Sequence, residues 1–93
     1  MVNYFSFEEL EEMNNEELRE IQESAELIFN KFNYDYYNNP TLIGYSNAVD
    51  EAINPIECHN AYIRYVYHLQ VIAIQVFTDN KILSINDLAK LVK

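Results

Sequence analysis

Polar residues recur at helical spacing in a stretch that holds no glycine or proline from Ile56 to Thr78. At about 100° per residue these positions fall in one sector, whereas the period of two of a strand could not place them on one face. We therefore predict a helix from Pro55 to Thr78, although its β-branched residues favour a strand. The polar positions are Glu57, Asn60, Arg64, His68, Gln75 and Asp79.

Two apolar sectors cover the rest of this predicted helix, so it should be buried on two sides. Its start is marked by Asn54 and Glu57, which can form a capping box around Pro55. The first sector comprises Cys58, Tyr62, Tyr65, Val66, Leu69, Ile72, Ala73 and Val76. The second comprises His59, Ile63, Tyr67, Gln70, Ile74 and Phe77.

Capping signals predict two further helices before the central one. Ser6 opens a short helix to about Met13, and a repeated signal opens a longer helix over 15–32. The longer helix carries a narrow apolar seam suited to packing along another helix. The seam comprises Leu18, Ile21, Ala25, Ile28 and Phe32, with Phe29 beside it.

Residues 33–46 look like a loop, because they contain Pro40 and the only glycine, Gly44. A short helix over 47–53 is expected next, with Asp50 favouring its N-terminus. After the central helix we predict a turn at 80–81. A last helix then runs from Ser84 to about Val92, with inward-facing residues Leu88, Leu91 and Val92.

These elements predict one acidic all-α domain over 1–93, a bundle of four to five helices. We expect the two long helices, near 15–32 and 55–78, to pack antiparallel, with shorter helices closing the ends. An α+β fold with strands over 62–77 is the alternative.

The composition narrows the choice of partners. A formal net charge of −9 over 93 residues argues against direct binding to nucleic acid or to an anionic membrane surface. The single cysteine, Cys58, favours a reducing, cytoplasmic setting. We recognise no signal peptide and no apolar run of about 20 residues that would span a membrane.

The negative charge is concentrated near the N-terminus. Nine glutamates lie within the first 26 residues, and Arg19 is the only base among them. Surface helices usually mix charges of both signs, so this imbalance favours a surface that binds a basic partner. Leu27 falls on the same side and could anchor that partner. The alternative is an acidic face that only keeps the protein soluble.

Tyrosines in the predicted loop are the second candidate feature, because tyrosine is favoured at protein interfaces. They could instead cover the end of the bundle. The residues expected to bind a partner are Glu9, Glu12, Glu16, Glu20, Glu23, Leu27, Tyr34, Tyr36 and Tyr37.

In size, charge and predicted fold the chain resembles, as a class, the small acidic helical inhibitors of phages and mobile elements, which include anti-CRISPR proteins and nuclease inhibitors. The resemblance implies a DNA mimic that blocks a nucleic-acid-binding protein in the cytoplasm of a bacterial host. The alternative is an assembly module or homodimer that uses the second apolar sector.

We expect no catalytic site, metal site or cofactor. Cys58 and His59 are adjacent and diverge on a helix, and His68 lies in another sector, so a zinc site or Cys–His pair is not indicated. Cys58 fits a small core residue. Residues 82–91 resemble the first helix of a helix-turn-helix, but no recognition helix follows them.

Overall fold

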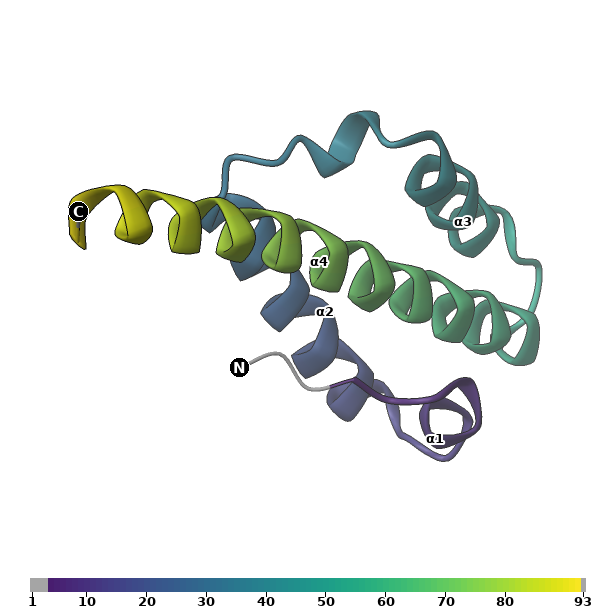
Figure 1. Ribbon diagram of the computed structural model, residues 1–93. Helices are drawn as coiled ribbons and strands as arrows, with labels where there is room; N and C mark the ends of the chain where they lie inside the picture. The colour runs from purple at the N-terminus through teal and green to yellow at the C-terminus, as the bar shows by residue number, and fades with distance from the viewer. Residues whose placement is uncertain (1–3, 93) are drawn as a thin grey trace.

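Residues 4–92 form four α-helices and one turn of 3-10 helix (Figure 1). The structure is a computed structural model that describes the backbone of residues 4–92 and the side chains of residues 4–79. The helices are α1 (Phe7–Glu11), α2 (Asn15–Lys31), α3 (Pro40–Glu51) and α4 (Pro55–Val92), and the 3-10 turn is η1 (Tyr36–Asn38). No strand occurs within residues 4–92, so the all-α prediction is confirmed and the α+β alternative is wrong.

The N-termini of the first two helices form as predicted. The Ser6 side chain accepts a hydrogen bond from the backbone N–H of Glu9, and the Glu9 carboxylate accepts one from the N–H of Ser6. Asn14 and Glu17 repeat this reciprocal pair at the start of α2. Each pair satisfies two of the N–H groups that a helix N-terminus leaves without intrahelical partners.

The two long helices run in the same direction, not antiparallel. Asn15 lies 3.0 Å from a ring nitrogen of His59, Gln22 accepts a hydrogen bond from the Tyr62 hydroxyl, and Phe32 packs edge-on against Phe77. Residue numbers thus rise together along α2 and α4. The antiparallel prediction is wrong because the connection contains α3, which makes the return path.

Helix α3 runs antiparallel to α4. Its Tyr45 stacks on His68, whereas its later residue Val49 lies near Cys58. Helix α3 also begins seven residues earlier than predicted, since Asn39 caps it and Pro40 occupies the favourable first position. The predicted loop to Ser46 and the predicted helix start at Asn47 are therefore wrong.

The position of Asp50 changes with the new bounds of α3. Asp50 lies in the last turn of α3, next to Glu51, which ends the helix. A carboxylate there faces the negative end of the helix dipole. The prediction that Asp50 favours the helix N-terminus is wrong.

Helix α4 continues without the predicted turn at 80–81 and reaches Val92. No glycine or proline lies between Ile56 and Lys93, and Asn80 alone does not stop a helix. Figure 1 shows the last turns of α4 extending beyond the other helices. The predicted inward orientation of Leu88, Leu91 and Val92 lies outside the described side chains.

The core consists of two clusters along α4. In one, Leu69 and Ala73 pack with Ala25 and Phe29 of α2 and with Leu42 of α3. In the other, Ile63 and Val66 pack with Leu10 of α1 and Leu18 of α2. Both apolar sectors of α4 are thus covered over 61–73, as predicted. Its polar sector is exposed except for His68.

Candidate partner-binding surface

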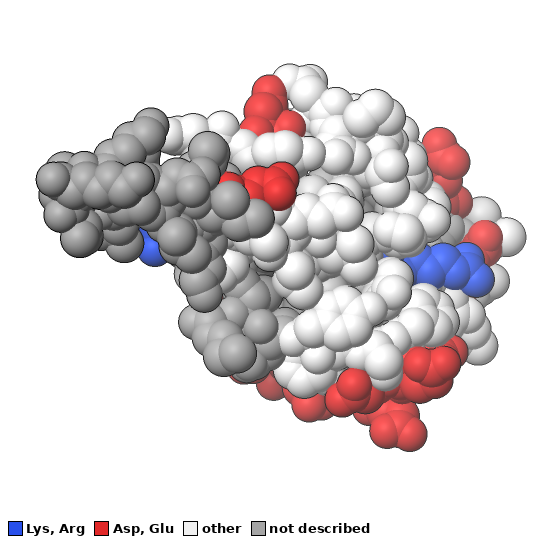
Figure 2. Space-filling model, viewed as in Figure 1, with Lys and Arg blue, Asp and Glu red and all other residues white. Residues whose placement is uncertain are grey.

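The outer faces of α1 and α2 carry most of the predicted partner-binding residues. Helix α2 exposes to water the glutamates and Leu27 that its helical spacing placed away from the apolar seam. Figure 2 shows acidic side chains along the lower edge of the molecule, where α1 and the start of α2 lie. The exposed predicted residues on this acidic face are Glu9, Glu12, Glu16, Glu20, Glu23 and Leu27.

Leu27 is the one large apolar side chain on the outer side of α2 that the structure leaves open. It is 69% exposed, although Ala25 and Phe29 on either side of it in the sequence are buried. It follows Glu20 and Glu23 at spacings of seven and four residues, which keeps all three on one side of the helix. A partner that contacts these carboxylates would also reach the Leu27 side chain.

Three of the N-terminal glutamates have structural roles. Glu9 and Glu17 complete the capping boxes of α1 and α2, and Glu26 accepts a hydrogen bond from the Tyr36 hydroxyl at 3.1 Å. Substitution of Glu9 would therefore alter the start of α1 as well as the charge of the face. The other exposed glutamates can be substituted without the loss of such a contact, so their substitution tests the charge of the face alone. They are Glu12, Glu16, Glu20 and Glu23.

Two of the three predicted tyrosines belong to the interior. The Tyr36 ring is buried and stacks on Phe29 with 4.7 Å between ring centroids. Tyr34 packs against the same cluster, and its hydroxyl accepts a hydrogen bond from Asn39. Tyr37 stacks on Tyr36 but is 74% exposed. Of the three, only Tyr37 offers most of its ring to a partner.

The environment of Tyr36 keeps its hydroxyl protonated. Burial raises the pKa of Tyr36, and the hydrogen bond with the Tyr37 hydroxyl and the charge of Glu26 raise it further. The neutral hydroxyl can therefore hold Glu26 of α2 beside the segment that precedes α3. This contact ties the loop to the acidic helix without making the loop part of the exposed face.

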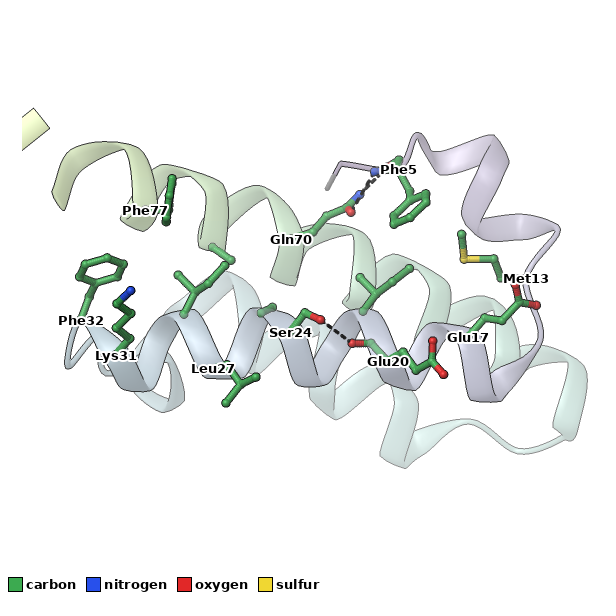
Figure 3. Close-up of a pocket in the computed structure, with 14 residues that line it drawn as sticks. Phe5, Met13, Glu17, Glu20, Ser24, Leu27, Lys31, Phe32, Gln70 and Phe77 are labelled. Atoms are coloured by element: carbon green, nitrogen blue, oxygen red, sulfur yellow. Dashed lines mark hydrogen bonds between the residues drawn. The ribbon is translucent and has the colours of Figure 1, made fainter. Parts of the chain in front are cut away.

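Sequence reasoning missed a groove that opens between α2 and α4. It has a volume of about 550 Å³, and Figure 3 shows side chains from the N-terminal segment, α2 and α4 around it. Apolar side chains form most of its lining: Phe5, Met13, Ile21, Ala25, Leu27, Ile28, Phe32, Ala73 and Phe77. In the sequence, the placement of Leu27 away from the apolar seam of α2 was the one feature that pointed to this groove.

Gln70 of α4 fixes the segment before α1, which forms one side of this groove through Phe5. Its amide is 2% exposed, accepts a hydrogen bond from the Phe5 backbone N–H at 3.1 Å, and donates one to the Phe5 carbonyl oxygen. A buried amide needs such partners because removing it from water costs free energy. The segment before α1 is thereby fixed against α4.

The cysteine and the two histidines of α4 contact different neighbours. Cys58 is half-buried against α3, with its sulfur 4.0 Å from the Val49 carbonyl oxygen. His59 contacts Asn15 of α2, whereas His68 stacks on Tyr45 of α3. Within the part of the chain that the structure describes, no three metal-ligating side chains come together.

Comparisons of the chain with protein-family models, curated proteins and solved structures found no match. The described residues also contain no helix that is both long enough and apolar enough to cross a membrane.

Proposed function

We propose that this protein binds a basic, nucleic-acid-binding surface of another protein through its acidic face and thereby inhibits that protein. The observation that carries the proposal is the exposed row of Glu16, Glu20 and Glu23 on α2, continued by Glu12. A rigid helix holds these carboxylates at fixed intervals, so they can act together on a complementary basic groove.

The spacing of the carboxylates supports a partner that otherwise binds a nucleic-acid backbone. Along α2, Glu20 lies about 6 Å beyond Glu16 and Glu23 about 4.5 Å beyond Glu20, given a rise of about 1.5 Å per residue. Phosphates along one DNA strand advance by about 3.4 Å per nucleotide along the axis and carry the same sign of charge, so each carboxylate step spans between one and two nucleotides. Competition with duplex DNA is the expected mode of inhibition.

Two exposed apolar side chains, one on α2 and one in the 3-10 turn η1, supply the second part of the proposed contact. Leu27 and Tyr37 are both largely exposed, and each is attached to a well-packed part of the bundle. Apolar anchors of this kind contribute the short-range free energy that salt does not screen, whereas the carboxylates accelerate association. Because nucleic-acid-handling proteins reside in the cytoplasm, the proposal implies a cytoplasmic location.

A capture experiment with two charge-matched variants tests the proposal. The face variant carries Glu16→Lys, Glu20→Lys and Glu23→Lys. The control variant carries Asp50→Lys, Glu51→Lys and Asp79→Lys, three exposed acids outside α1 and α2. Both change the net charge by the same amount, so only the position of the charge differs.

We expect wild-type protein and the control variant, immobilised and exposed to a bacterial lysate, to retain the same basic nucleic-acid-binding protein at low salt. Added duplex DNA should displace it, and the face variant should not retain it. A partner that binds all three proteins equally, or that resists both salt and DNA, would show that the acidic face is not the binding surface. Circular dichroism confirms that each variant is folded.

A further inference from the structure

Three aromatic rings stack where η1 meets the C-terminal half of α2. The Tyr36 ring stacks on Phe29 and on Tyr37, with ring centroids 4.7 Å and 4.2 Å apart. Phe29 is fully buried and Tyr36 is 7% exposed, whereas Tyr37 is 74% exposed. The stack therefore begins in the core and ends in a ring whose outer face is open to water.

Hydrogen bonds hold this stack in one arrangement. The Tyr36 hydroxyl oxygen lies 3.1 Å from Oε2 of Glu26 and 2.9 Å from the Tyr37 hydroxyl oxygen. A hydroxyl has one hydrogen and a carboxylate only accepts, so Tyr36 donates to Glu26 and accepts from Tyr37. Both hydroxyl hydrogens are thus engaged within the chain that leads to Glu26. The Tyr37 hydroxyl then offers oxygen lone pairs, and no hydrogen-bond donor, to a ligand.

Negative charge lies close to this open ring. The half-buried Glu26 ends the chain of hydroxyl groups, and the exposed Glu23 lies one turn earlier on α2. Asp35, also exposed, comes two residues before Tyr37. The face of an aromatic ring carries the negative part of its quadrupole, so the ring, the hydroxyl lone pairs and the carboxylates all favour a cation.

We propose that Tyr37, supported by Tyr36 and Glu26, binds an arginine side chain of the partner protein, with the guanidinium stacked on the open face of the Tyr37 ring. This inference rests on the proposed function and names the side chain that the basic partner supplies. A guanidinium is planar and more weakly hydrated than an ammonium group, so it stacks better on an aromatic face. Arginine also binds phosphate in surfaces that recognise nucleic acid, so its capture here agrees with competition against DNA.

The proposed arginine site continues the acidic row of α2. The row contains Glu16, Glu20 and Glu23, and Glu26 follows three residues after Glu23. Exposed carboxylates attract basic groups of either kind from a distance, and salt screens that attraction. A ring held in place by its neighbours discriminates at short range and loses little conformational entropy on binding. The row thus sets the overall affinity, whereas Tyr37 sets the preference for arginine over lysine.

Calorimetric titrations of the full-length chain with an arginine peptide and a lysine peptide test the site. Both peptides have about nine residues and the same charge, so only the basic side chain differs. We expect wild type to bind the arginine peptide more tightly. Tyr37→Leu should lower the ratio of the two affinities by about two- to fivefold, the loss of one exposed cation–π contact. Tyr37→Phe keeps the aromatic face, so this matched control should keep the wild-type ratio.

The face variant separates this inference from the proposed function. It leaves the ring stack unchanged, so it should bind both peptides more weakly than wild type and keep the preference for arginine. No preference in wild type, or an unchanged preference in Tyr37→Leu, would overturn the arginine site and leave the acidic face unaffected. If the preference depends on Tyr37 but the face variant still retains the captured partner, the arginine site is supported and the proposed function is wrong.

Discussion

Leu69 of α4 lies in the core where α2, α3 and α4 pack together. It is fully buried and lies in the cluster that contains Phe29 of α2 and Leu42 of α3. Removal of a buried leucine side chain costs its transfer free energy and leaves a cavity that neighbouring helices fill only in part.

Leu69→Ala should therefore lower the free energy of unfolding by about 2–5 kcal/mol. In a domain of this size that is a large fraction of the total stability. Urea unfolding followed by circular dichroism measures the change. A loss well below about 1 kcal/mol would mean that the central face of α4 is not packed as described.

His68 makes stability depend on pH. Its ring stacks on Tyr45 at 4.2 Å between centroids, and burial lowers the pKa of His68 below its usual value. The unfolded chain therefore takes up a proton at this site more readily than the folded protein does. The stabilising contribution is complete above the unfolded pKa of about 6.5 and is lost as the pH falls through and below it.

We predict that wild type loses more stability between pH 7.5 and pH 5.5 than His68→Gln does, because the glutamine has no proton to gain. Urea titrations of both proteins at the two pH values give the difference. Equal losses in wild type and variant would assign the pH dependence to other groups.

At the scale of whole elements, the order and direction of the helices decide where the surfaces form. Parallel packing places the seam of α2 against one side of α4 and α3 against another, and it leaves the groove open on a third side. Spacing alone identified the helical character of α2 and α4 and the capping boxes at Ser6 and Asn14, since these are local properties.

Helix direction could not be derived in the same way, because the seam of α2 fits a parallel or an antiparallel neighbour equally well. The start of α3 was missed because Pro40 and Gly44 were both taken as signs of a loop. Pro40 is favourable at the first helical position, and Gly44 is tolerated within α3. The groove was missed because it exists only once α2, α4 and the segment of Phe5 are assembled.

Gly44 offers a direct test of the observed helix α3. A Cβ atom built at this position meets nothing within 4 Å, and the residue lies within the helix. Gly44→Ala should raise the free energy of unfolding by about 0.5–1 kcal/mol, because alanine loses less backbone entropy in a helix. If urea unfolding shows that the alanine destabilises the protein, residue 44 does not lie within an exposed stretch of helix.

At the scale of the whole molecule, the concentration of charge in α1 and α2 opposes folding. Like charges at spacings of four residues, such as Glu16 and Glu20, repel one another, and the net charge of −9 adds a general repulsion. The fold tolerates this cost, which is the physical reason to look for a binding role in the acidic face.

Added salt should therefore stabilise the protein. Sodium chloride at about 0.5 M shortens the screening length to a few ångströms and weakens the repulsion between exposed carboxylates. We expect a higher midpoint of thermal unfolding than at about 0.02 M, followed by circular dichroism. The face variant should gain less from salt than wild type, and an equal gain would mean that the repulsion is not centred on α2.

The measurement that tests the acidic-face account most directly is a competition titration on the captured partner. Labelled duplex DNA is bound to the partner, and wild type, the face variant and the charge-matched control are added in turn. We expect wild type and the control to displace the DNA at the same concentration, and the face variant to leave it bound. Displacement by the face variant at the wild-type concentration would contradict the account.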